Sequence, residues 1–282
     1  MANKKALLIG INRYKIPGAD LRGCVNDVVN MQAVLTQYYG FAAGDISMLT
    51  DYDATKKAMQ AGIVKLLKGA KKGDVLLLHY SGHGANVPDK SGDEADHRDE
   101  ILCPTDLDWY DPLLDDWLRT TFDKLADGVN LTVVMDCCHS GSNTRAFYPP
   151  DAPSIPRFLP CPLDLMAAES GRKLRGTTRS TLRRSTPAKR RKSDIVDVDI
   201  PEVLITGCRD TQTSADAYIK GTYNGALTYN LVAAIKAVRG RISHRDLHTD
   251  TVEKLKTGKF DQVPQLEGRK TRFDAPFLAP LA

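Results

Sequence analysis

Short, mostly apolar runs alternate along this chain with longer segments in which apolar residues recur at the spacing of a helix. This alternation of predicted strands and helices is compatible with few folds. The runs lie at 5–11, 46–49, 74–80, 131–135 and 203–206, with a last extended segment at 262–266. Helices are expected at 25–35, 55–67, 115–125, 226–238 and 243–255. Strands that are apolar throughout need cover on both faces, as in a mostly parallel sheet. We therefore predict a three-layer α/β/α sandwich with a central sheet of about six strands.

One segment differs from the rest in composition. Six prolines fall between 149 and 162, and 171–192 holds ten Lys/Arg and no Asp/Glu. The net charge of the whole chain is +4, so the remainder carries about −6. Such a segment cannot build a core and is expected to be a mobile loop. This divides the predicted domain into a first part at 1–148, a basic linker at 149–197 and a second part at 198–282.

Nothing in the sequence predicts export or a membrane span. No run approaches the roughly 18 apolar residues that a span needs. A basic start precedes six apolar residues, but this run is too short for a signal peptide and fits a buried strand better. The six cysteines include the adjacent pair Cys137 and Cys138. In a chain of this size without an export signal we expect reduced thiols and a cytoplasmic protein.

A cysteine and a histidine follow two of the predicted strands. His83 lies between Gly82 and Gly84 after the run 74–80, and Cys138 follows the run 131–135. Carboxyl ends of parallel strands gather the sites of such sheets, so the two side chains are expected to meet. A thiol beside a base is a nucleophile for acyl transfer. Either residue alone is more often structural, but their shared position favours catalysis.

Zinc binding is the alternative chemistry for these motifs. Cys137, Cys138 and His139 are consecutive, and His79 precedes His83 by four residues. Consecutive ligands do not easily surround one tetrahedral ion, and the histidines begin in a strand rather than on one helix face. The pattern therefore disfavours a structural zinc site.

The motifs together resemble those of the metacaspases. The paired signatures are 79–84 (His-Tyr-Ser-Gly-His-Gly) and 136–141 (Asp-Cys-Cys-His-Ser-Gly). Supporting matches occur at 21–27, 99–104 and 207–217, and the resemblance runs from residue 4 to about residue 280 except for the linker. The length is similar to that of the bacterial members called orthocaspases. The resemblance implies a caspase-like fold and a cysteine endopeptidase.

The resemblance also implies roles for individual residues. Cys138 would be the nucleophile and His83 its acid/base partner, with the N–H groups of Gly84 and Cys138 as the oxyanion hole. The S1 pocket would be lined by Cys24, Asp27, Ser81 and Asp136, and Asp210 and Asp216 could form the cleft wall. Two buried carboxylates suit a cation, so protein or peptide substrates with Arg or Lys at P1 are expected.

The basic segment then gains a role as a substrate of the enzyme itself. We predict autocleavage at one of ten residues: Arg172, Lys173, Arg175, Arg179, Arg183, Arg184, Lys189, Arg190, Arg191 and Lys192. A solvated loop or contact with nucleic acid is the alternative role of this segment.

No cofactor is required for the chemistry, but the resemblance implies calcium as an activator. Its ligands would be Asp99, Asp115, Asp116 and an acid after the nucleophile. Arg145 stands where that last acid is expected. Asp115 and Asp116 also suit the start of a helix without any metal.

Two other classes of function stay open. A non-catalytic caspase-like scaffold or regulator would keep the fold without activity, but both dyad positions are intact. A nucleic-acid binder would use the basic segment. The resemblance suggests a monomer.

Overall fold

The computed structural model describes residues 2–88, 98–139, 152–162, 164, 193–209 and 212–281. Seven strands form its central sheet, in the order β2-β1-β3-β7-β10-β13-β9. Their bounds are β1 Lys4–Gly10, β2 Ile46–Thr50, β3 Val75–Ser81, β7 Asn130–Asp136, β9 Ile195–Asp197, β10 Glu202–Thr206 and β13 Gln265–Gly268. All neighbouring pairs are parallel except β10 with β13. Strands from before and after the predicted linker thus share one sheet.

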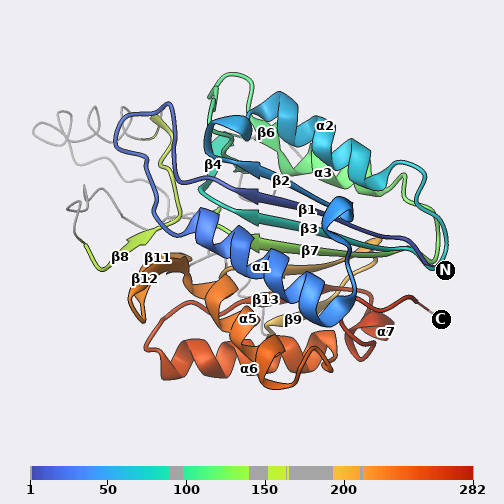
Figure 1. The fold of residues 1–282 in the computed structure, drawn as a ribbon. Coiled ribbons are helices and arrows are strands. Elements are labelled where there is room, and N and C mark those ends of the chain that lie inside the picture. Colours follow the sequence, from blue (N-terminus) through green and yellow to red (C-terminus); the bar gives the residue numbers. More distant parts are fainter. Residues whose placement is uncertain are drawn as a thin grey trace, which may run out of the picture.

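Helices cover both faces of this sheet (Figure 1). On one face lie α2 Lys56–Leu67 and α3 Asp115–Phe122, and on the other α1 Cys24–Tyr39, α5 Ala226–Ala237 and α6 His244–Thr257. Short helices are η1 Ala43–Asp45, η2 Asp51–Asp53 and α7 Lys270–Phe273. The Thr55 side chain caps α2 by accepting a hydrogen bond from the Ala58 N–H at 3.2 Å.

Two apolar cores result from the alternation of side chains along the buried strands. In β1, Leu7 and Ile9 pack into the core under α2, whereas Ala6 and Leu8 pack into the core under α1. The predicted α/β/α sandwich is therefore confirmed, with seven strands in place of about six.

Two small sheets lie beside the central one. The first contains β8 Ser154–Pro156, β11 Ala215–Ile219 and β12 Thr222–Gly225, and the second contains β4 Gly84–Pro88, β5 Arg98–Leu102 and β6 Leu113–Leu114. The helices in the described part of the chain include none long and apolar enough to cross a membrane.

The expectation of a structureless linker at 149–197 is wrong for two stretches, which form β8 and β9. Its prolines do not prevent β8 because this strand pairs only with β11 and lies at a sheet edge, where a missing N–H costs little. The predicted cleavage residues Arg172–Lys192 all lie outside the described residues.

Candidate active site

The ends of β3 and β7 place the two predicted catalytic residues at one edge of the sheet. These strands are parallel, with Ser81 opposite Asp136 in the last pair. A side chain added at Gly84 would come within 2.1 Å of the Cys138 carbonyl oxygen, so only glycine permits this close approach. His83 and Cys138 are 4% and 1% exposed, and both are therefore nearly inaccessible to water.

The imidazole of His83 is held through one of its two nitrogens. Nε2 lies 2.8 Å from the carbonyl oxygen of Ala19, which can only accept, so Nε2 carries the proton. Nδ1 is buried without a hydrogen-bond partner among the described residues. Burial lowers the pKa of His83 to about 4. The ring is thus neutral near pH 7, with the Nδ1 lone pair available to accept a proton.

The sulfur of Cys138 lies against the main chain of Ser214, the residue before strand β11. Sγ accepts a hydrogen bond from the Ser214 N–H and lies 3.5 Å from the Ser214 carbonyl oxygen. In the described part of the chain, no hydrogen bond joins Sγ to His83. In this structure the thiol is therefore hydrogen-bonded to Ser214 and not to the imidazole.

A residue that the sequence analysis did not single out, Arg157, occupies the space between these elements. Its carbonyl oxygen accepts hydrogen bonds from the N–H groups of Gly84 and Cys138, at 3.1 and 3.2 Å. Its own N–H donates to the carbonyl oxygen of Ser214 at 2.9 Å. The main chain of β8 is thereby fixed between β11 and the ends of β3 and β7.

The Arg157 side chain is fully buried in an acidic site. Nη2 lies 2.8 Å from Asp27 Oδ2 and 3.0 Å from Asp216 Oδ1. Nη1 lies 3.3 Å from Asp136 Oδ2 and donates to Ser81 Oγ at 2.8 Å. One guanidinium therefore neutralises part of the charge of three carboxylates, which is how a protein tolerates buried charge.

Each carboxylate is oriented by groups other than Arg157. Asp27 accepts from the Gly225 N–H at 2.9 Å, and Asp216 from the Gly23 N–H at 2.9 Å. Asp136 accepts from the N–H and hydroxyl of Thr228, both at 2.8 Å. The acidic site, defined as Asp27, Ser81, Asp136 and Asp216, is thus assembled from four separate elements.

The burial of these charged groups shifts the pKa values of Asp27 and Arg157. Burial raises the pKa of Asp27 to about 7, although the Arg157 charge opposes the rise. Burial alone would lower the pKa of the Arg157 guanidinium, but Cys24 and the three carboxylates leave it above its ordinary value. Arg157 is therefore charged at any pH at which the fold exists.

The structure thus brings together all four residues predicted for S1. Asp27, Ser81 and Asp136 bond Arg157, and the buried Cys24 thiol lies beside Ser81. Asp216, predicted for the cleft wall, is a member of the acidic site, while Asp210 lies outside the described residues. Arg157 and Thr228 were missed because no local motif marks them, and Ser214, although it lies in the family-like stretch 207–217, was given no role.

The residues predicted to bind calcium lie on β5 and at the start of α3. Arg119 pairs with Asp115 at 3.5 Å and with Asp116 at 3.9 Å. Burial, followed by the charge of Glu100, raises the pKa of Asp115 to about 6. No three His, Cys, Asp or Glu side chains of the described residues form a group able to hold a metal. The described side chains, Asp99 among them, do not by themselves form a calcium site.

The six cysteines all lie in the described part of the chain, and none forms a disulfide.

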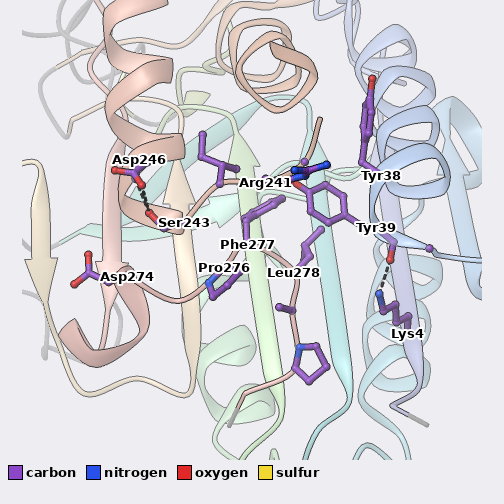
Figure 2. Close-up of a pocket in the computed structure, with 15 residues that line it drawn as sticks. Lys4, Tyr38, Tyr39, Arg241, Ser243, Asp246, Asp274, Pro276, Phe277 and Leu278 are labelled. Atoms are coloured by element: carbon purple, nitrogen blue, oxygen red, sulfur yellow. Dashed lines mark hydrogen bonds between the residues drawn. The ribbon is translucent and has the colours of Figure 1, made fainter. Parts of the chain in front are cut away.

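A pocket of about 720 Å³ lies away from this site, near the first residue of β1. It is lined by residues such as Lys4, Tyr39 and Phe277 (Figure 2). None of the predicted site residues lines it.

Several known proteins are similar to this chain in sequence or in fold. The family described as "Metacaspase, peptidase C14 domain" matches residues 4–146. Metacaspase-1A of Neosartorya fischeri is 35% identical over 93% of this chain and 64% of its own length. Metacaspase-1 of Eremothecium gossypii is 33% identical over 94% of this chain and 63% of its own length. The chain spans a little under two thirds of these relatives.

Two solved structures extend the comparison. A protein from Geobacter sulfurreducens superimposes with a TM-score of 0.69 at 28% identity, covering 99% of this chain and all of its own. Caspase-1 of Spodoptera frugiperda, at 12% identity, superimposes with a TM-score of 0.55 over 95% of this chain and 91% of its own, and shows the fold alone. The predicted family is confirmed by the sequence matches: this chain belongs to the metacaspases of peptidase family C14.

Proposed function

We propose that this metacaspase is a cysteine endopeptidase that cleaves proteins after arginine, and less well after lysine. Cys138 is the nucleophile and His83 the acid/base group. Family membership supports a cysteine peptidase, and the neutral, buried imidazole with a free Nδ1 lone pair supports the role of His83.

The observation that carries the proposal is the binding of Arg157. Its side chain occupies a site with three carboxylates while its carbonyl oxygen accepts from two N–H groups, one of which belongs to Cys138. An arginine at P1 of a substrate needs the same two contacts: a cation site for the side chain and an oxyanion hole for the carbonyl. An aspartate at P1 would instead meet three like charges.

The reaction follows from these positions. Cys138 rotates toward His83, Nδ1 takes the thiol proton, and the sulfur attacks the P1 carbonyl carbon. The N–H groups of Gly84 and Cys138 stabilise the oxyanion. The imidazolium then protonates the leaving amine as the C–N bond breaks. Water, deprotonated by His83, hydrolyses the thioester and restores the thiol.

Arginine should be preferred to lysine because both terminal nitrogens are used. Nη1 serves Ser81 and Asp136, and Nη2 serves Asp27 and Asp216. An ammonium group is a single point and cannot satisfy four partners on two sides at once. Each loss of about 1.4 kcal/mol in transition-state stabilisation lowers kcat/KM tenfold.

Hydrolysis of fluorogenic peptides that differ only in P1 tests this proposal. We expect rates in the order Arg, Lys, Asp for wild type and none for Cys138→Ala. Because Arg157 fills the site of the intact chain, the assay should follow the protein over time and record its fragments. No hydrolysis at any time, with or without calcium, would instead support the non-catalytic scaffold.

Further properties are proposed on the family resemblance. They are action as a cytoplasmic monomer, cleavage within Arg172–Lys192, and activation by calcium. A chelator titration of peptide hydrolysis tests the calcium requirement, and the mass of the active species tests the monomer.

A further inference from the structure

The segment 153–159 is hydrogen-bonded along strand β11, in the way that an extended peptide substrate could be bound. Strand β8 lies antiparallel to β11, with Pro156 opposite Ala215 and Ser154 opposite Ala217. The Tyr218 N–H donates to the Pro153 carbonyl at 2.8 Å. Extended peptides are commonly bound by proteins in this way, as an added strand at a sheet edge.

The contacts continue across the peptide bond that follows Arg157. On its amino-terminal side the Arg157 carbonyl oxygen accepts from Gly84 and Cys138, and on its other side the Leu159 N–H donates to the Gly84 carbonyl at 2.9 Å. The bond between Arg157 and Phe158 is therefore held on both sides, next to the nucleophile proposed above.

The side chain of Arg157 gives this position its selectivity. The residues that flank it within the segment are partly exposed, whereas Arg157 alone is fully buried and bonds Asp27, Ser81, Asp136 and Asp216. A substrate from outside needs the same acidic site, the same two N–H groups and the same edge of β11. It cannot bind while 153–159 is in place.

We propose that Arg157–Phe158 is the bond that the enzyme first cleaves in its own chain, and that 153–159 excludes other substrates until then. This rests on the proposed function. Cys138 Sγ bonds the Arg157 carbonyl carbon, the C–N bond to Phe158 breaks, and the Phe158 amine leaves with the proton held by His83. Water then releases Arg157 as a carboxylate and restores the thiol. Both new ends can leave the cleft.

Phe158→Pro is the sharpest variant because it leaves Arg157 in place. The Phe158 N–H donates no hydrogen bond to any described residue, so proline removes none. Proline also favours an extended preceding residue, which is the conformation of a paired strand. The tertiary amide should resist cleavage, whereas Arg157→Ala also empties the acidic site and risks misfolding.

The test compares four full-length proteins by intact mass, terminal sequencing and hydrolysis of an Arg peptide. Wild type should yield a fragment beginning at Phe158, at a first-order rate independent of protein concentration. Cys138→Ala should stay whole. Phe158→Pro should stay whole at this bond and hydrolyse the peptide at least about tenfold more slowly than processed wild type, because few of its clefts are open. A variant with alanine at all ten basic positions of 171–192 should still yield the Phe158 fragment.

Two outcomes contradict the inference in different ways. If wild type hydrolyses the peptide fully while Arg157–Phe158 stays intact, the inference fails and the proposed function stands. Thermal unfolding should first show that Phe158→Pro is folded. If the folded variant is as active as processed wild type, the segment does not exclude substrates. If none of the four proteins hydrolyses the peptide, and Arg157→Ala tested beside them does not either, the proposed function fails as well.

Discussion

Replacing Arg157 by methionine should destabilise the uncleaved protein by several kcal/mol. The change is made in Cys138→Ala, so that the chain stays whole. Methionine keeps an apolar stem but leaves Asp27, Asp136 and Asp216 buried without a cation. Removing one partner of a buried ion pair costs about 3–5 kcal/mol. For a chain of this size, that lowers Tm by roughly 6–20 °C.

The loss of stability caused by Arg157→Met should grow with pH, and the pKa of Asp27 gives the sign of this pH dependence. Its ordinary value is 3.8, and burial raises the pKa in the folded state to about 7 even beside Arg157. A folded carboxyl with a raised pKa binds more protons than the unfolded chain, so stability falls as pH rises from about 4 to the folded pKa. In the parent this fall ends near pH 7. Without the guanidinium the folded pKa is higher, and the fall continues beyond pH 7.

Thermal unfolding of Cys138→Ala with and without Arg157→Met, at pH 5 and pH 8.5, measures this effect. The matched control is Arg269→Met, whose side chain is 43% exposed and pairs with Asp199 at the surface. A surface pair of this kind contributes little. A Tm change below about 2 °C for Arg157→Met at both pH values, or a larger change at pH 5, would refute the burial described above.

Three further predictions concern the processed enzyme. Gly225→Ala should lower kcat/KM for Arg peptides about 10- to 100-fold, because in the intact chain its Cβ would lie 2.2 Å from Nη1 of Arg157, whose place the substrate arginine is proposed to take, and 2.2 Å from Asp136 Oδ2. Gly44→Ala, with open space around it, should change nothing. Asp27→Asn should cost roughly 100-fold in kcat/KM for Arg peptides, with a smaller loss for Lys, and an equal loss for both would contradict the two-sided contact. In a pH–rate profile, kcat should fall as pH drops through about 4, where His83 gains a proton and can no longer act as the base.

Much of the fold was predictable because buried strands carry a strong local signal. The run expected at 131–135 is strand Asn130–Asp136, and that at 203–206 is Glu202–Thr206. These strands are covered on both faces, so apolar residues mark nearly their whole length. Strands β4, β5 and β8 were not predicted, because these short strands include polar residues or prolines and leave no such pattern.

The candidate site was predictable only where a local motif marks it. Asp27, Ser81 and Asp136 each lie within a short stretch that resembles the family, and the structure brings them together. Arg157 acts through contacts with residues far from it in sequence, such as Asp27, 130 positions away, and partly through backbone atoms that any residue possesses. Ser214 lies within the family-like stretch 207–217, but its contacts with Arg157 and Cys138 are also made by its own backbone atoms. Arg157 shares its charge with the ten basic residues that follow, and no motif near it in the sequence marks it as the one that is buried.

The proposed specificity and the proposed latency have one physical origin in this molecule. The three carboxylates come from α1, from the end of β7 and from β11, so folding itself forces their charges together. Burial and the neighbouring Asp136 charge raise the pKa of Asp27, and the Arg157 cation limits this rise. The folded chain therefore requires a cation at this place before any substrate arrives, and Arg157 supplies it. If Arg157 leaves as proposed, the same requirement persists, and the site that the chain filled for its own stability would then favour an arginine from a substrate.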